Sequence, residues 1–350
     1  MNTQAHADAA VRGPGESVRT ATLTGTTSPL FIEPVDPGIA NDLHAAVEWV
    51  GEHRRWLDDV LLTRGAYVLR NFPVVDTTAF DSIMESYESA VMDYSGGATV
   101  RGTVQGRIYE ATRLPPDLSL TLHQEMSYLP QWPGRLAFYC HVAAATGGET
   151  IIGDMRAAGA AMPAEFFKAI DQRGVLYCRN FRDQGDTRQP ILDTIHRTWQ
   201  DVFLTDDKAI AEAGCVRMGL EYRWNDDGSL STEFRTAGVI EHPATGERVW
   251  FNQIPAQTMR TKIERRFGPA IAPIIEEYYP PGRTRPTETW FGDGGAIDTA
   301  DIDAVYDALD AVTVAFPWQA GDVMVLDNVL TAHGRNPYTG DRDVQVALLA

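Results

Sequence analysis

Residues 316–335 read FPWQAGDVMVLDNVLTAHGR, two largely apolar runs on either side of a Gly-Asp pair. We interpret the first run as the end of a strand and Gly321-Asp322 as a turn that reverses the chain, because Gly and Asp favour tight turns. The second run then forms a strand that carries His333 near its far end. This stretch predicts antiparallel β structure in the C-terminal part of the chain.

Short strand-like segments of the same kind precede this stretch, and Pro and Gly turns separate several of them. They cover residues 123–128, 136–142, 150–152, 233–235, 238–240 and 248–251. Apolar residues at helical spacing predict helices over residues 41–62 and 299–311. Many short strands with irregular inserts favour a mainly β fold with flanking helices, built on a double-stranded β-helix (jelly roll) core, over alternating βαβ units.

The domain organisation expected from the sequence is simple. The 350 residues are enough for one elaborated domain, which we expect to cover residues 30–350. Residues 1–29 are rich in Ala, Thr, Gly and Ser and are expected to form a flexible tail. A segment from about residue 157 to 310 reads as a long helical and irregular insert.

Charge and cysteine content narrow the class of protein. The chain has 30 basic and 48 acidic residues, a net charge of −18, and no dense basic patch. Such a chain repels phosphate backbones and anionic membranes, so we expect neither nucleic acid nor membrane as a partner. Three widely spaced cysteines and the lack of an apolar leader predict a cytoplasmic protein without disulfides. The oligomeric state is left open.

The candidate chemistry rests on two histidines and one glutamate. His123-Gln-Glu125 is an H-x-E motif, and on a strand residues i and i+2 point to the same face. His333 adds a second imidazole. Two imidazoles and one carboxylate leave coordination positions open, which suits Fe(II) that binds O2 and a chelating co-substrate. The same ligand types also serve hydrolytic zinc sites, so a zinc-dependent hydrolase on a jelly roll is an alternative.

A chelating 2-oxo acid needs a cation for its distal carboxylate. Arg342 follows the turn at residues 336–340, and its planar guanidinium suits a carboxylate. Thr150 lies at the start of a predicted strand beside Gly147-Gly148 and offers a hydroxyl to the same carboxylate. The ordinary alternatives are a solvated turn arginine and a strand threonine.

At these residues the sequence resembles the taurine/2-oxoglutarate dioxygenase family, the clavaminate-synthase-like branch of Fe(II)- and 2-oxoglutarate-dependent oxygenases. Within that branch it is most similar to syringomycin-type amino-acid hydroxylases of natural-product and antibiotic pathways. The resemblance runs from roughly Arg64 to Leu349. The motifs that carry it are LHQEMSY at 122–128, GGET at 147–150, WQAGD at 318–322, Asp327-Asn328 and AHGR at 332–335.

The resemblance implies roles for these residues. His123, Glu125 and His333 match the iron triad, and Thr150 matches the threonine that helps to hold 2-oxoglutarate. The taurine enzymes place their arginine further along, where this chain has Ala347 and Leu348. Arg342 is therefore the expected substitute, with Arg335 as the fallback.

The resemblance also implies the reaction and its setting. Because iron halogenases of this superfamily lack the carboxylate that Glu125 supplies, we expect oxygen chemistry. The expected reaction is hydroxylation of an unactivated C–H bond of an amino acid or amino-acid-derived intermediate, with release of succinate and CO2. Ser127 and Tyr128 are the expected substrate neighbours, and the insert is expected to act as a lid.

Several alternatives stay open. Desaturation or ring closure begins with the same chemistry. The substrate is a small molecule that is either free or tethered to a carrier protein, and the acidic chain favours a free one. A non-catalytic jelly-roll binding protein is the third class of function considered.

Overall fold

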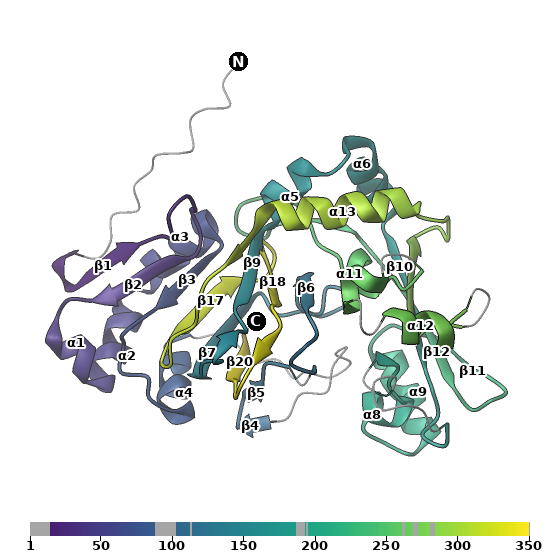
Figure 1. Ribbon diagram of the computed structural model, residues 1–350, viewed down its shortest axis with the longest axis horizontal. Coiled ribbons are helices and arrows are strands. Elements are labelled where there is room, and N and C mark those ends of the chain that lie inside the picture. Colours follow the sequence, from purple (N-terminus) through teal and green to yellow (C-terminus); the bar gives the residue numbers. More distant parts are fainter. Residues whose placement is uncertain are drawn as a thin grey trace.

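The computed structural model describes residues 15–87, 103–112, 114–186, 193, 195–260, 263–268, 272–280 and 284–349. Two β-sheets form its central jelly roll (Figure 1). The larger has the strand order β1 (Val18–Ala21), β2 (Leu30–Pro34), β3 (Ala66–Leu69), β17 (Val323–Asp327), β7 (Arg135–Val142), β20 (Asp343–Leu349), β5 (Ile108–Glu110) and β4 (Thr103–Gln105). The smaller has the order β16 (Thr313–Ala315), β9 (Thr150–Asp154), β18 (Thr331–Arg335) and β6 (Leu120–His123).

Side chains on the two faces of the large sheet pack into two different apolar clusters. On β17, Met324 and Leu326 pack into the cluster that also holds Leu122 and Ala332 of the small sheet. Successive side chains of a strand point to opposite faces, so Val323 and Val325 belong to the other cluster. The jelly roll thus has a buried interior between its sheets and a second buried face outside the large sheet.

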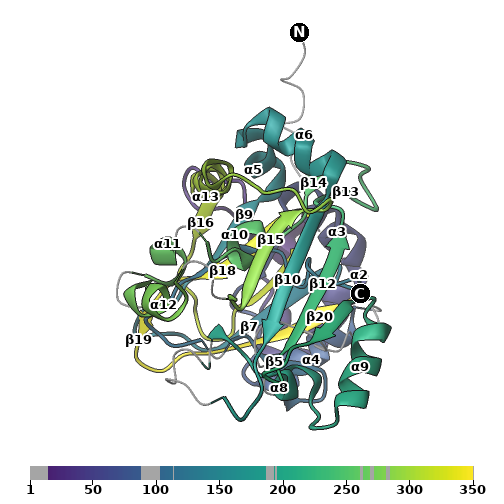
Figure 2. The same cartoon turned by 90° about the vertical axis from the view of Figure 1, so that its right-hand side faces the viewer.

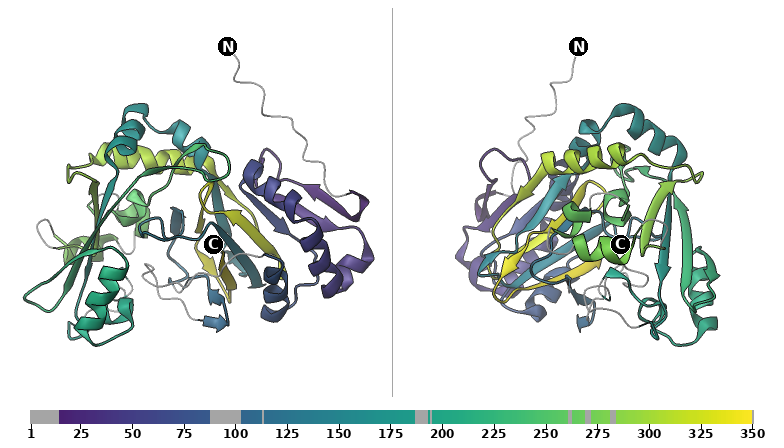
Figure 3. Two further views of the ribbon diagram at one scale, coloured as in Figure 1. Left: turned by 180° about the vertical axis from the view of Figure 1, so that it is seen from behind. Right: turned by 45° about the vertical axis from the view of Figure 1, so that its right-hand side comes forward.

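Helices cover that outer face. They are α1 (Pro37–Asn41), α2 (Leu43–Glu52), α3 (Arg54–Arg64) and α4 (Thr77–Glu85). Trp49, Leu57 and Phe80 pack with the outer side chains of β17, and the helices are seen against this face from behind (Figure 3, left). Gly65 ends α3 in a left-handed conformation with φ 78°, so the chain turns directly into β3.

The segment between the two halves of the jelly roll forms a second structural unit. Its four-stranded sheet has the order β11 (Glu221–Trp224), β12 (Leu230–Thr236), β10 (Val175–Phe181) and β15 (Thr287–Phe291), and β12, β10 and β15 lie side by side in Figure 2. We call it the second sheet. A hairpin of β13 (Val239–Glu241) and β14 (Arg248–Trp250) follows, and β8 (Thr146–Gly147) pairs with β19 (Tyr338–Thr339). The accompanying helices are α5 (Met155–Ala161), α6 (Ala164–Arg173), α8 (Trp199–Phe203), α9 (Lys208–Arg217), α10 (Ile254–Gln257), α11 (Ile263–Phe267), α12 (Ala272–Tyr278) and α13 (Thr299–Val312).

The mainly β class with flanking helices is confirmed, and several local expectations are wrong. The strand that follows Gly321-Asp322 ends at Asp327, and His333 lies on the separate strand β18 of the other sheet. Strand β1 lies within residues 1–29, where we expected a flexible tail, and pairs antiparallel with β2. The helix expected over residues 41–62 is divided at His53, whose backbone N–H and ring Nδ1 both lie within hydrogen-bonding distance of Trp49 O. The strand expected over 123–128 ends at His123. In the described part of the chain, no helix is long and apolar enough to span a membrane.

Candidate metal centre and co-substrate site

The structure brings His123, Glu125 and His333 together. One donor atom from each lies within 4.8 Å of the others. Glu125 Oε2 is 4.0 Å from His123 Nε2 and 3.8 Å from His333 Nε2. Donor atoms about 2.1 Å from one metal and at right angles to each other lie roughly 3 Å apart, so small side-chain rotations would close the set on an ion. Two neutral nitrogens and one carboxylate are a donor set that Fe(II) accepts.

The two histidines meet because β6 and β18 are neighbours. His123 and His333 are direct partners in the antiparallel register, and their ring centroids are 4.3 Å apart. This close approach depends on Gly334, where a Cβ atom would lie 2.3 Å from the carbonyl oxygen of Leu120. Nδ1 of His123 is 2.9 Å from the carbonyl oxygen of Thr121. A carbonyl only accepts, so Nδ1 carries the proton and Nε2 keeps the lone pair that a metal needs.

Glu125 reaches the histidines from a turn, which corrects the expectation that it shares a strand face with His123. Residues 125–128 form a turn in which Met126 has a positive φ of 58°. Asn328 fixes the backbone of this turn. Its Oδ1 accepts from Glu125 N at 2.7 Å, and its Nδ2 donates to Glu125 O at 3.0 Å and to Pro133 O at 2.8 Å.

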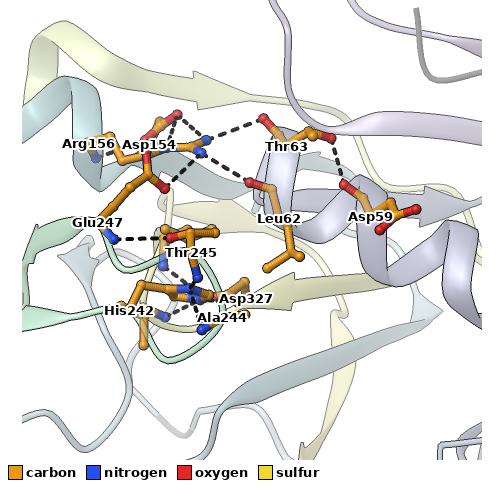
Figure 4. Close-up of polar contacts among 12 residues, drawn as sticks. Asp59, Leu62, Thr63, Asp154, Arg156, His242, Ala244, Thr245, Glu247 and Asp327 are labelled. Atoms are coloured by element: carbon orange, nitrogen blue, oxygen red, sulfur yellow. Dashed lines mark hydrogen bonds and ion pairs between the residues drawn. The ribbon is translucent and has the colours of Figure 1, made fainter. Parts of the chain in front are cut away.

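A buried histidine, His242, joins the β13–β14 hairpin to Asp327, the residue before Asn328 (Figure 4). Nδ1 of His242 accepts from Ala244 N at 3.3 Å and from Thr245 N at 3.1 Å, so Nε2 holds the proton and donates to Asp327 Oδ2 at 3.0 Å. The other carboxylate oxygen of Asp327 accepts from the backbone N–H groups of Val329 and Leu330. His242 therefore supports the segment that includes Asn328.

Thr150 lies inside the jelly roll at the start of β9, the strand position predicted from the sequence. It is 3% exposed, and its Oγ1 accepts a hydrogen bond from Trp318 Nε1 at 3.1 Å. A threonine hydroxyl also has one proton to donate, so this bond leaves a donor for a carboxylate.

The two candidate arginines differ in how their donors are used. Arg335 is 2% exposed, and its Nη groups donate to the carbonyl oxygens of Leu114, Pro115 and Leu118. Arg342 makes a single hydrogen bond to the described residues, from Nε to Gly148 O at 2.9 Å. Among the described residues, both Nη groups of Arg342 are thus available to a ligand, whereas those of Arg335 hold a loop and only its buried Nε has no partner.

Electrostatics favours an anion beside these arginines. Burial, and then the charge of Arg335, lower the pKa of the Arg342 guanidinium to about 10. Burial also lowers the pKa of Arg335. Two partly desolvated cations that repel each other are stabilised by a bound anion. Both guanidinium groups also lie near the ring of Tyr338, at 5.1 Å for Arg335 and 5.6 Å for Arg342.

The expected substrate neighbours occupy different settings. The hydroxyl of Ser127 donates to Gln124 O at 3.0 Å, which is a bond within the turn. Tyr128 packs edge-on against Tyr177 of the second sheet, with ring centroids 6.2 Å apart, and lies under the guanidinium of Arg179. Sequence reasoning assigned no role to Arg179 because a lone arginine in a strand carries no signal.

Comparisons with known proteins agree on one family. The model of "Taurine catabolism dioxygenase TauD, TfdA family" matches residues 32–348. A clavaminate synthase-like protein of Arabidopsis thaliana is 30% identical over 327 residues, which are 91% of this chain and 93% of that protein. The dapdiamide synthesis protein DdaC of Enterobacter agglomerans is 29% identical over 293 residues, 84% of each chain.

Solved structures share the fold. PvcB from Pseudomonas aeruginosa has a TM-score of 0.50 and 14% sequence identity, covering 96% of this chain and 92% of its own. A taurine dioxygenase from Burkholderia xenovorans has a TM-score of 0.50 and 17% identity, covering 95% and 89%. At these identities the likeness concerns the jelly-roll architecture.

Proposed function

Because the chain belongs to the TauD, TfdA family of dioxygenases, we propose that it uses Fe(II), 2-oxoglutarate and O2 to hydroxylate an unactivated C–H bond of an amino acid or amino-acid-derived intermediate. Succinate and CO2 are the co-products. The observation that carries this proposal is the convergence of His123, Glu125 and His333 at one point, near a buried threonine hydroxyl and an arginine with unused donors.

In this proposal the three ligand side chains hold the iron. When bound, the ion supplies the positions at which 2-oxoglutarate chelates and O2 is activated. The chain's own part is orientation. The bond from His123 Nδ1 to Thr121 fixes the tautomer, and the bonds from Asn328 fix the backbone that carries Glu125. Since Glu125 is present, oxygen transfer is favoured over halogenation.

Arg342 and Thr150 bind the distal carboxylate of 2-oxoglutarate in the same proposal. A guanidinium with free Nη donors can make a charge-assisted pair with a carboxylate, and the Thr150 hydroxyl can donate a further bond. Arg335 keeps the loop at residues 114–118 in place and adds positive potential. The assignment therefore prefers Arg342 over Arg335.

The substrate class is supported by relatives and by position. DdaC, whose name assigns it to dapdiamide synthesis, covers most of the chain at 29% identity. Tyr128 is the last residue of the turn that carries Glu125 and contacts Tyr177 and Arg179 of the second sheet, so a substrate held near the iron would lie close to both. The insert from about residue 157 to 310, which contains the second sheet, would then act as the lid.

Anaerobic titration tests the proposal. Adding Fe(II) and 2-oxoglutarate to metal-free protein should produce the visible charge-transfer band of the chelate. His333→Ala should abolish this band and Arg342→Met should weaken it, whereas His44→Ala, a change at an exposed histidine of α2, should leave it intact. Hydrolytic turnover with bound zinc and without O2 would contradict the proposal.

A further inference from the structure

The inner face of the second sheet is attached to the metal-binding turn. On β10, Tyr177, Arg179 and Phe181 are buried at alternate positions and so share one face. The hydroxyl of Tyr177 accepts from Gln253 N at 2.8 Å, and Gln253 Nε2 donates to Gln124 O at 2.6 Å. Gln124 lies between two of the metal ligands, so this face of β10 is oriented toward the metal centre.

Arg179 is the cation on that face. It is 8% exposed, and its guanidinium carbon lies 5.0 Å from the ring centroid of Tyr128 and 4.9 Å from that of Phe181. Aromatic rings attract a guanidinium through their faces, and its planar fork can still bind a carboxylate through N–H donors. The site thus combines a desolvated positive charge with apolar walls.

Hydroxyl groups flank this arginine in register. Thr232 of β12 and Thr287 of β15 are its direct cross-strand partners, so all three side chains lie in one row across the sheet. The hydroxyl of Thr232 donates to the carbonyl oxygen of Arg179 at 3.3 Å. Thr287 Oγ1 is buried and has no hydrogen-bond partner among the described residues. A buried polar atom without a partner is destabilising unless a ligand or water satisfies it.

A buried acceptor is carried by α10, which packs against β15. Oε1 of Gln257 is buried and, within the described ranges, has no hydrogen-bond partner. Its neighbour Thr258 contacts the Thr289 hydroxyl, and Thr289 lies two residues along β15 from Thr287. The same side of the second sheet therefore offers donors for a carboxylate and an acceptor for an ammonium group.

We propose that Arg179 and Thr287 bind the α-carboxylate of the substrate and that Gln257 accepts a hydrogen bond from its ammonium group. The substrate is then a free α-amino acid, because an aminoacyl group tethered to a carrier protein through a thioester has no α-carboxylate. This inference rests on the proposed oxygenase function and narrows its substrate class.

The experiment compares free proteinogenic L-amino acids with their methyl esters in 2-oxoglutarate-dependent succinate release. In the wild-type protein at least one free acid should stimulate release, and its ester should be at least tenfold less effective. Arg179→Met should lower kcat/KM for the acid ten- to hundredfold and remove the preference over the ester, with partial recovery in Arg179→Lys. Thr287→Val, which keeps the side-chain shape, should raise KM several-fold.

Controls separate this inference from the function on which it rests. Arg235→Met changes an exposed arginine of the same sheet and should behave as wild type. All of these variants should retain the anaerobic chelate band; its absence in the wild type would refute the oxygenase proposal itself. Three outcomes would refute the carboxylate site while the chelate band still forms. Esters could work as well as free acids, Arg179→Met could keep the preference for the acid, or no free acid could stimulate succinate release.

Discussion

Replacing Asn328 by alanine would remove the side chain that fixes the turn carrying Glu125. Asn328 is fully buried and makes three hydrogen bonds, two to the backbone of Glu125 and one to Pro133 O. The substitution removes these three hydrogen bonds from buried backbone groups, and each such loss costs about 1–3 kcal/mol. Allowing for partial relaxation, we expect the free energy of unfolding to fall by about 3–5 kcal/mol. Because the position of Glu125 loosens, we also expect Fe(II) affinity to fall about 10- to 100-fold.

Urea unfolding of the metal-free protein and a chelator competition titration with Fe(II) measure the two effects. Asn41→Ala is the matched control, since the Asn41 side chain makes one exposed hydrogen bond to Pro37 O. It should change the free energy of unfolding by no more than about 0.5 kcal/mol. If Asn328→Ala behaves like this control in both measurements, Asn328 does not organise the site.

Three further predictions follow from packing and charge. In the proposed site the cation of Arg342 binds 2-oxoglutarate, and burial lowers its pKa to about 10. The chelate band should therefore report a constant 2-oxoglutarate affinity between about pH 7 and 9 and a loss of about tenfold per pH unit above pH 10. An unchanged affinity through that range would argue against Arg342. Gly334→Ala should lower the free energy of unfolding measured in urea by at least about 2 kcal/mol and should weaken iron binding, because the added Cβ would clash with the carbonyl oxygen of Leu120. Wild-type values in both measurements would show that β6 and β18 can move apart without loss of stability or of iron affinity. Burial raises the pKa of Cys140 to about 12. Iodoacetamide at pH 8 should therefore label this thiol at least about a hundredfold more slowly in the native than in the unfolded protein, as measured by mass spectrometry. Equal labelling rates would mean that the interior is open to solvent.

The class of fold and enzyme could be predicted from the sequence because short motifs carry both. The H-x-E motif, Thr150 and the AHGR motif indicate an iron- and 2-oxoglutarate-dependent dioxygenase, and family membership confirms the dioxygenase class. Strand β17 was predictable because its apolar run follows a Gly-Asp turn. These signals are local, so they do not depend on knowing which segments meet.

The features of the structure that could not be predicted from the sequence depend on long-range contacts. Glu125 and Asn328 are 203 residues apart, and nothing in either segment specifies the register between them. Strand β1 has one buried side chain followed by three exposed ones, so it shows no alternation. Apolar spacing continues across His53, and only its contacts with Trp49 show that the helix ends there.

The pairing of β6 with β18 has a consequence for the order of biosynthesis. His123 and Glu125 leave the ribosome long before His333, and the strand that carries His333 can join the sheet beside His123 only after it has been made. Contacts between such distant segments form late in folding. Iron therefore cannot meet its full set of proposed ligands before β18 has been made, and we expect the metal to load only after that strand has joined the sheet.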